Sequence, residues 1–393
     1  MPKHYVLILG GGPAGLSTAL HLKRIAPHLA PRILILEKGH YPRPKLCAGG
    51  LVSDAEVILG RLGLDVTEIP HVDASAAHLD FAGKGLTVRV RKSHALRVIR
   101  RDEFDDWLAR KTREAGIEIR EGVTVKNVIP DSEGVTVETD SETYRTKIVV
   151  GADGSNGVTR GCIFPHEPVY TARVLEVLTP SFDFAPQKVS VAPLRTNHKR
   201  NEAYFDFFPV PDGIAGYVWD FPTQVKGELM RCWGIYDTNI LADGKRPQLK
   251  ELLAQEMARR GLDLDDYEIK GHPIRLFAPE NKMSVPYILL VGDAVGADPI
   301  FGEGISIALG YGAVAAREIS ESMRRNEFSF NGYKRRVVRS GLGQALLARW
   351  VIAYIIYPLK WKWFQILLWR ILKPIVLIVA WVFVLNWGKR LRI

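Results

Sequence analysis

The sequence predicts an α/β protein: a domain of parallel strands and helices is interleaved with an antiparallel β-sheet, and an apolar helical C-terminal segment follows. Three observations predict this. Two glycine-rich turns, at residues 10–15 and 292–304, each follow a short apolar strand and precede a helix. Aromatic and β-branched strands lie between them. From Leu346 to the end, apolar residues dominate.

The first turn has the spacing of a dinucleotide-binding fingerprint. Residues 4–9 predict a buried strand and Ala14–Ile25 a helix, and between them lie Gly10, Gly12, Pro13, Ala14 and Gly15 in G-x-G-x-x-G order. Glycines let the backbone approach a pyrophosphate, whose charge is favoured at a helix N-terminus. The next strand, residues 32–36, ends at Glu37, which is placed to accept from ribose hydroxyls. If either motif occurred alone, the alternative would be a glycine-rich turn that binds no ligand. Both together predict a Rossmann-like domain that holds the two ends of FAD.

The remaining elements follow in chain order. Ser53–Gly63 predicts a helix with Ser53 and Glu56 in a capping box, and Asp102–Gly116 a second helix. Strands are predicted at residues 122–129, 134–140, 144–150, 170–178, 188–194, 202–210, 215–221 and 229–236. We therefore predict a discontinuous FAD-binding domain at residues 1–70, 95–165 and 272–330, a substrate-binding β-sheet domain at 71–94 and 166–271, and a C-terminal helical membrane-associated segment at 331–393.

The composition of the chain argues against several classes of protein and of site. The 393 residues include only three cysteines, so neither a disulfide scaffold nor a C-x-x-C site is expected. The histidines show no metal-ligand spacing, so we predict no metal. The chain enters a strand almost at once, without the order of a secretory signal, which favours a cytosol-facing compartment. The net charge of +10 is concentrated late in the chain among Leu, Ile and Val, which argues against nucleic-acid binding.

The C-terminal segment is predicted to attach to a membrane. Its charge-free run, residues 374–388, is about fifteen residues long, below the roughly twenty that a spanning helix needs. Two interfacial or re-entrant helices, broken near Pro358 and Pro374 with cations reaching the headgroups, fit better than a span, so the segment is monotopic or a short anchor. A buried helix pair or an oligomer interface is the alternative. We expect the protein on the cytoplasmic face of a membrane.

Four motifs together resemble the para-hydroxybenzoate hydroxylase-type FAD fold: residues 10–15, Arg101-x-x-Phe104-Asp105, Gly151-Ala-Asp153-Gly154 and Gly292-Asp293. Two more, at residues 44–51 (PKLCAGGL) and 217–222 (YVWDFP), resemble the geranylgeranyl reductase family within it. The resemblance covers about residues 4–325. It does not extend to the apolar C-terminal segment.

The motifs and the resemblance assign roles to named residues. Cofactor binding falls to Gly10, Gly12, Pro13, Ala14, Gly15, Glu37, Lys38, Cys47, Ala48, Arg101, Val125, Asp153, Gly292, Asp293, Pro299, Gly302, Gly304 and Ile305. Substrate binding falls to Gly49, Gly50, Tyr217, Trp219 and Phe221, and catalytic roles to Cys47, Tyr217 and Trp219. Arg101 as a surface charge, Asp153 as a turn former, Cys47 as a small buried side chain and the aromatic triplet as plain core remain alternatives. Glu303 either gates the site or caps a helix.

The resemblance implies an FAD-dependent reductase that saturates C=C bonds of a geranylgeranyl or other polyprenyl chain on a membrane lipid, quinone or chlorophyll precursor. NADPH or reduced ferredoxin would supply the electrons, the latter by docking on basic residues. Two other classes remain open: a flavin monooxygenase, epoxidase or halogenase-like enzyme acting on an apolar substrate, and an electron-transfer flavoprotein docked at a membrane. Tyr217 and Phe221 depart from the Trp-x-Trp-x-Ile-Pro pattern of flavin halogenases, which disfavours that branch.

Overall fold

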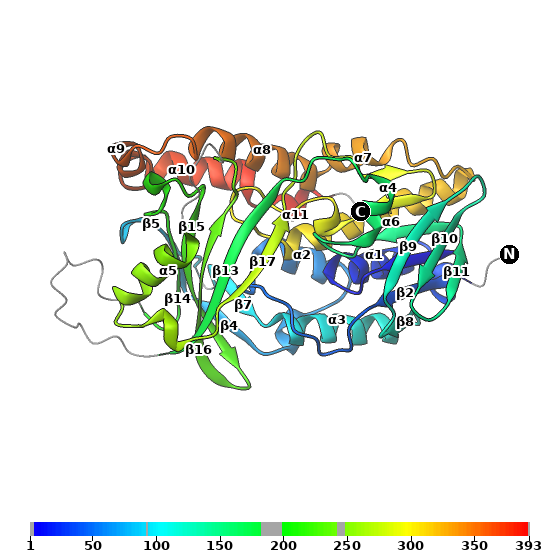
Figure 1. The fold of residues 1–393 in the computed structure, drawn as a ribbon, viewed down its shortest axis with the longest axis horizontal. Helices are drawn as coiled ribbons and strands as arrows, with labels where there is room; N and C mark the ends of the chain where they lie inside the picture. The colour runs from blue at the N-terminus through cyan, green and yellow to red at the C-terminus, as the bar shows by residue number, and fades with distance from the viewer. Residues whose placement is uncertain (1–3, 92, 182–198, 242–247, 392–393) are drawn as a thin grey trace.

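The computed structural model describes residues 4–91, 93–181, 199–241 and 248–391. Its strands form four sheets. A six-stranded sheet lies in one half of the molecule and a seven-stranded sheet in the other (Figure 1). The predicted strand at residues 188–194 lies outside the described residues.

The six-stranded sheet is the Rossmann-like part of the fold. Its order is β18 (Ser284–Val285), β19 (Ile288–Leu290), β12 (Ile148–Gly151), β1 (Val6–Leu9), β2 (Ile33–Glu37) and β8 (Glu118–Glu121). All pairings are parallel except that of β18 with β19. The central strands are apolar at every position because both faces of this sheet are covered. The two strands that carry the glycine-rich turns, β1 and β19, therefore end on the same side of the sheet, with β12 between them.

Helices α1 (Pro13–Ile25) and α6 (Ile305–Arg325) pack closely on one another beside this sheet (Figure 1). They begin directly after the two glycine-rich turns, as predicted. Helices α2 (Ser53–Arg61), α3 (Arg101–Glu114) and α4 (Val158–Ile163) complete this half, together with a small antiparallel sheet of β11 (Thr143–Thr146), β10 (Val135–Thr139) and β9 (Val125–Pro130).

The seven-stranded sheet runs in the order β17 (Lys270–Arg275), β13 (Thr171–Pro180), β16 (Glu228–Asp237), β15 (Gly216–Val225), β14 (Glu202–Asp206), β5 (Ala76–Phe81) and β6 (Lys84–Val88). Successive side chains along each strand point to opposite faces of the sheet, so each face packs against a different set of residues. One face, here called the aromatic face, carries Tyr217, Trp219, Phe221, Cys232 and Tyr236. The opposite face packs against α5 (Leu249–Ala258).

A third, three-stranded sheet connects the two halves, with β3 (Gly50–Leu51), β7 (Leu96–Ile99) and β4 (His71–Ala74) in that order. Residues 71–94, which were predicted to belong to the substrate-binding domain, contribute β4 to this connecting sheet and β5 and β6 to the seven-stranded one. The connecting sheet places the loop before β3, which contains Cys47, between the two large sheets.

The C-terminal segment contains α7 (Tyr333–Arg339), α8 (Gly341–Ile356), α9 (Lys362–Ile366), α10 (Lys373–Val379) and α11 (Trp387–Arg390). Helices α8, α9 and α10 lie along one side of the molecule (Figure 1). The helices break near Pro358 and Pro374, as predicted. In the described part of the chain no single helix has the length and apolar character to cross a bilayer. Residues 362–371 and 373–390 meet those criteria only as a pair bent by 77°.

Three local predictions differ from the structure. The capping box at Ser53 does not form, because α2 is preceded by Val52 and Ser53 is already its first residue. Glu56 instead pairs with His94 and Arg97. The predicted strand at residues 144–150 is two strands in different sheets, β11 and β12, and the one at 202–210 stops at Asp206.

Candidate functional site

The turn between β1 and α1 has the form that a phosphate site requires. Gly10 has a φ of +108°, and a Cβ there would meet the Ala152 carbonyl oxygen at 2.4 Å. A Cβ at Gly15 would meet the Gly10 carbonyl oxygen at 2.1 Å, so the helix and the turn can touch only if both residues are glycine. Gly12 precedes α1 and Pro13 and Ala14 form its first turn, in which no side chain caps the backbone N–H groups. That helix end is open to an anion.

Glu37 ends β2 beside this turn, as predicted. Its Oε2 accepts from the Gly11 N–H at 2.8 Å, and its Oε1 accepts from the Gly39 N–H at 2.9 Å. Arg43 Nε lies 3.2 Å from the same Oε1. The carboxylate is therefore held at the glycine turn, while the neighbouring Lys38 is exposed. Arg43, which no sequence motif indicated, is part of this arrangement.

The second turn meets the first directly. Gly292, with a φ of +61°, lies between the first turns of both helices: a Cβ there would be 2.7 Å from Ala14 Cβ and 3.7 Å from Ala308 Cβ. Asp293 follows, and its Oδ1 lies 3.6 Å from where a Cβ on Gly304 would be. Burial raises the pKa of Asp293, and the cations of Lys45 and Arg101 partly offset that rise. Residues from opposite ends of the chain thus form one site.

The loop from Asp298 to Glu303 closes this turn and carries Pro299, which is buried. Gly302 has a φ of +64°, and a Cβ there would meet the Tyr236 ring at 2.7 Å. Glu303 caps α6, since its Oε1 accepts from Ser306 N at 2.8 Å and from Ser306 Oγ at 2.6 Å. Of its two predicted roles, the structure shows the helix cap. Ile305, the first residue of α6, is buried in the core.

Arg101 and the Cys47 loop lie next to this site. Arg101 donates from Nε and Nη2 to the two oxygens of Asp105, both at 2.9 Å. Burial alone would lower the pKa of Arg101, but the Asp105 carboxylate outweighs it and the pKa is raised. Cys47 packs on the core of the Rossmann-like half and Ala48 on the aromatic face. Burial raises the pKa of the Cys47 thiol, and Arg101 partly opposes this. The Arg101 side chain is 10% exposed, so it is a largely buried charge at the site and not a surface one.

Asp153 and Val125 have mainly local contacts. Asp153 Oδ2 accepts from Thr159 N at 2.8 Å and Thr159 Oγ1 at 2.9 Å, so it caps α4. Its Oδ1 is buried without a hydrogen-bond partner among the described residues. Val125 begins β9 and packs on the small core beneath the three-stranded β9–β11 sheet. The turn-forming role of Asp153 is present, and its second oxygen is buried.

The aromatic face meets the Cys47 loop from the other side. A Cβ on Gly50 would be 3.5 Å from the Phe221 ring, and a Cβ on Gly49, whose φ is +77°, would lie 1.9 Å from the Ile99 carbonyl oxygen. Tyr217 donates to the Phe301 carbonyl oxygen at 2.6 Å. The predicted substrate residues are thus brought together, and Tyr217 also holds the loop at residues 298–303.

The C-terminal segment completes this region, which the sequence did not predict. Trp369 stacks on Phe207 of the aromatic face at 4.1 Å between ring centroids. Tyr357 donates to the Ile300 carbonyl oxygen at 2.8 Å. Arg349, 2% exposed, donates from Nη1 to Asp298 Oδ2 at 3.0 Å and to Glu303 Oε2 at 3.3 Å. The segment therefore contacts the loop that forms the site.

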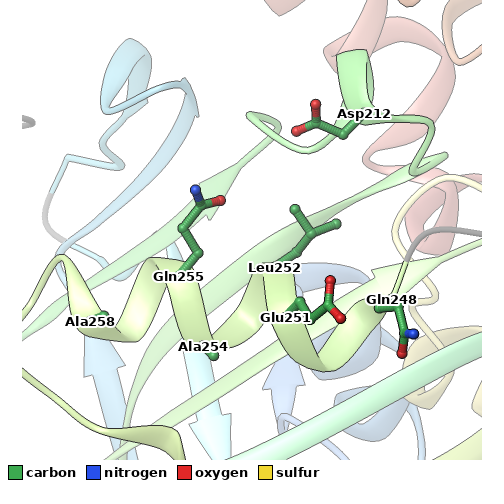
Figure 2. Close-up of a pocket in the computed structure, with 7 residues that line it drawn as sticks. All are labelled: Asp212, Gln248, Glu251, Leu252, Ala254, Gln255 and Ala258. Atoms are coloured by element: carbon green, nitrogen blue, oxygen red, sulfur yellow. The ribbon is translucent and has the colours of Figure 1, made fainter.

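A hollow of about 550 Å³ lies elsewhere, alongside α5 (Figure 2). Its lining comes from Asp212 and one side of that helix: Gln248, Glu251, Leu252, Ala254, Gln255 and Ala258. Because α5 covers the face of the seven-stranded sheet opposite the aromatic one, this hollow is not part of the site. Within the described ranges, no group of three or more His, Cys, Asp or Glu side chains could hold a metal ion.

The residues present fit FAD. A close-packed glycine turn at an uncapped helix end suits a diphosphate, and a carboxylate at the end of β2 suits a ribose. The glycines at 302 and 304 bring bare backbone close to Tyr236 and to Asp293, which suits the approach of a flat ring. Residues 3–308 also match the family model of the FAD binding domain.

Relatives and solved structures agree with this fold. An uncharacterized protein of Methanosarcina barkeri is 28% identical over 352 residues, which is 89% of this chain and 83% of that protein. Digeranylgeranylglycerophospholipid reductase 3 of Methanosphaera stadtmanae is 26% identical over 82% of this chain and 79% of its own length. A geranylgeranyl bacteriochlorophyll reductase-like protein of Thermoplasma acidophilum superposes with a TM-score of 0.75, at 21% identity, over 99% of this chain and 98% of its own.

Enzymes of other named activities match as well. Rifampicin monooxygenase of Streptomyces venezuelae is 26% identical over 77% of this chain and 61% of its own length. The halogenase PltM superposes with a TM-score of 0.67, at 15% identity, over 92% of this chain and 78% of its own. These structural likenesses show a common fold and not a common reaction. With more than three quarters of its length matched by the family model, this chain belongs to the FAD binding domain family and is an FAD-dependent oxidoreductase.

Proposed function

We propose that this oxidoreductase is a reductase that saturates C=C bonds in a geranylgeranyl or other polyprenyl chain carried by a membrane lipid, quinone or chlorophyll precursor. One observation carries the proposal: the aromatic face and the inner side of the C-terminal segment form one continuous apolar cluster, which begins beside the cofactor site and ends under α9 and α10. A long hydrocarbon suits such a surface better than a polar metabolite does. The names of the two reductase relatives support the same substrate class.

The outer side of the C-terminal segment supports membrane attachment. Twelve large apolar side chains are exposed there: Val351, Tyr354, Ile355, Trp361, Trp363, Ile371, Ile375, Leu377, Ile378, Trp381, Val382 and Phe383. We call these the apolar surface of the segment. Exposed Lys362, Lys389 and Arg390 flank it. Exposed tryptophans and cations beside an apolar surface fit the interface of an anionic bilayer on its cytoplasmic face, so the segment would lie in the membrane as a monotopic anchor.

The chain's own residues then divide the work. The β1–α1 turn and Glu37 would bind the nucleotide end of FAD, and Asp293 and Gly302 would hold its flavin end beside the aromatic face. When bound and reduced, FAD supplies hydride chemistry. Tyr217 holds the 298–303 loop, and Trp219 and Phe221 orient an apolar chain and exclude water. NADPH or reduced ferredoxin is proposed as the electron source.

The test is chemical. The purified protein is reconstituted in vesicles, reduced with dithionite without oxygen, and incubated with a geranylgeranyl glycerolipid. We expect products heavier by two hydrogens for each bond reduced, read by mass spectrometry. A stoichiometric consumption of oxygen and NADPH with an oxygenated or halogenated product would instead show a monooxygenase or halogenase. No turnover of any lipid by protein with full FAD content would favour an electron-transfer flavoprotein.

A further inference from the structure

One row of residues crosses the aromatic face next to the site. The strand registers align Lys270 of β17 with Glu176 of β13, Glu176 with Gly234 of β16, and Gly234 with Trp219 of β15. Directly opposed residues of an antiparallel pair point to the same face, so all four share the face that carries Tyr217 and Phe221. Glu176 is the acidic residue in this row, and no sequence motif indicated it.

Gly234 lets the Trp219 ring cover this row. A Cβ on Gly234 would lie 2.1 Å from Trp219 Cζ2 and 2.3 Å from Cη2, and 2.4 Å from the Leu175 carbonyl oxygen of β13. The indole therefore lies over the bare backbone of β16 and extends from β15 towards β13, where Glu176 is. Its Nε1 is buried with no hydrogen-bond partner among the described residues.

Glu176 is buried in the same place. It is 6% exposed, and its Oε2 has no hydrogen-bond partner in the described ranges. Burial raises its pKa to about 7, an effect that Arg100, Lys270 and the Cys47 backbone N–H only partly oppose. The thiols of Cys47 and Cys232 also face it, and its charge raises the pKa of both, although burial raises them more. A buried carboxyl that still holds its proton near neutral pH is uncommon and marks an acid that can donate.

We propose that Glu176 is the general acid of the reduction and donates the proton that the alkene requires. This inference rests on the proposed function. One carbon of the double bond gains a hydride, which oxidises the reduced cofactor by two electrons, and its neighbour gains the proton from Glu176. Two C–H bonds replace the π bond, and Glu176 is left as a carboxylate. Lys270, one strand away, is exposed, so solvent can return the proton.

The thiol of Cys47 is the competing donor. Burial raises its pKa above the ordinary value, which makes it a weaker acid than the carboxyl beside it. It packs on the Rossmann-like half, whereas Glu176 lies on the sheet that the apolar substrate would cover. Cys47 therefore shapes the boundary of the site, and Glu176 carries the proton.

Glu176→Gln tests this, because it keeps the size of the side chain and removes the acid. With FAD bound at wild-type stoichiometry, we expect lipid reduction to fall at least 100-fold while reduction of the flavin by dithionite is unchanged. Wild-type kcat should fall as pH rises through about 7, where the acid loses its proton. Glu176→Asp should restore part of the rate with a shifted pH profile. Glu256→Gln is the control, since Glu256 is a buried glutamate on the helix that covers the opposite face.

A second readout needs no lipid. In infrared spectra of the cofactor-loaded protein, the difference between wild type and Glu176→Gln should contain a protonated carboxyl band that disappears with a midpoint near pH 7. A wild-type rate and pH profile in Glu176→Gln, or the absence of that band at pH 6, would overturn the inference and leave the reductase proposal standing. A wild-type protein that reduces no polyprenyl lipid would overturn the reductase proposal itself, and the infrared titration would then still decide whether Glu176 carries a proton.

Discussion

At the scale of single residues, the glycines at the nucleotide turn differ sharply from glycines elsewhere. A Cβ on Gly15 would collide with backbone at 2.1 Å, whereas a Cβ on Gly60, inside α2, would meet nothing within 4 Å. The backbone of the turn cannot move away without opening the contact between β1 and α1. The same change of glycine to alanine therefore has opposite consequences at the two positions.

We expect Gly15→Ala to lower the free energy of unfolding by about 1–3 kcal/mol, as overpacking does, and to lower the bound FAD per chain. Gly60→Ala is the matched control and should raise stability by about 0.4–1 kcal/mol. The measurements are thermal unfolding and the ratio of flavin to protein absorbance after desalting. Equal flavin content in the two variants would contradict the assignment of this turn to the cofactor.

The residues that the sequence predicted are those whose chemistry depends on local spacing. Gly10, Gly15 and Glu37 follow from a motif within one strand–turn–helix unit. Glu176 and Arg349 depend on contacts made by distant segments, so no spacing indicated them. A signal was present in both cases: Glu176 occupies an inward position in the alternation of Ala172, Val174 and Leu178, and Arg349 interrupts an apolar helix. In both cases a charged residue occupies a position at which the period of the strand or helix requires an apolar residue.

At the scale of elements, α8 is joined to the cofactor loop through a buried ion pair. Arg349 on α8 is 2% exposed and Asp298 is fully buried, with 3.0 Å between Nη1 and Oδ2. Arg349 Nη2 also donates to the Val384 carbonyl oxygen at 2.8 Å, which ties the end of the chain to the same point. Removing one charge would leave the other buried without compensation.

Arg349→Met should therefore lower the free energy of unfolding by about 3–5 kcal/mol and weaken FAD binding, since the 298–303 loop loses its anchor. The double variant Arg349→Met with Asp298→Asn should recover part of that loss. Arg110→Met removes an exposed pair with Asp106 and should cost no more than about 1 kcal/mol. Chemical denaturation of the three variants measures the free energy of unfolding. A similar loss of that free energy in Arg349→Met and Arg110→Met would show that the Arg349–Asp298 pair does not hold the loop.

Element boundaries were predictable where a change of period or a proline marks them, as at the start of α10. The boundaries were not predictable where the pairing of one strand with another decides them. The run at residues 144–150 is uniformly strand-like, yet it turns at Lys147 and its two halves join different sheets, because β11 pairs with β10 and β12 with β1. The Ser53 capping box did not form for a similar reason, since Glu56 pairs with residues distant in the chain, Arg97 of β7 and His94 just before that strand.

At the scale of the whole molecule, the apolar surface of the C-terminal segment stands apart from the rest of the described surface. Other exposed large apolar side chains, such as Leu229 at 55%, occur singly on other elements. Scattered residues of that kind are ordinary, whereas a contiguous set of this size marks an interaction surface. The sequence predicted this composition but not that the inner side of the same helices would be part of the site.

Ile378→Glu with Trp381→Glu should reduce co-sedimentation with vesicles of phosphatidylglycerol and phosphatidylcholine several-fold, because two side chains that are 62% and 65% exposed would no longer bury apolar area. Leu229→Glu is the control and should bind as wild type does. Binding should be weaker with pure phosphatidylcholine and at high salt, since cations flank the surface. Equal binding of the double variant and the wild type would contradict membrane docking by this surface.

The last described turn of the chain has a practical consequence for anyone who wishes to shorten this protein. Trp387 is fully buried, with its ring 2.6 Å from where a Cβ on Gly310 would lie, and the Gly388 N–H donates to Asp54 at 2.8 Å. Deleting the apolar C-terminal segment to improve solubility would remove the residues that cover α6 and α2. The truncated protein would expose core residues in place of a membrane-binding surface. It would therefore aggregate instead of becoming more soluble.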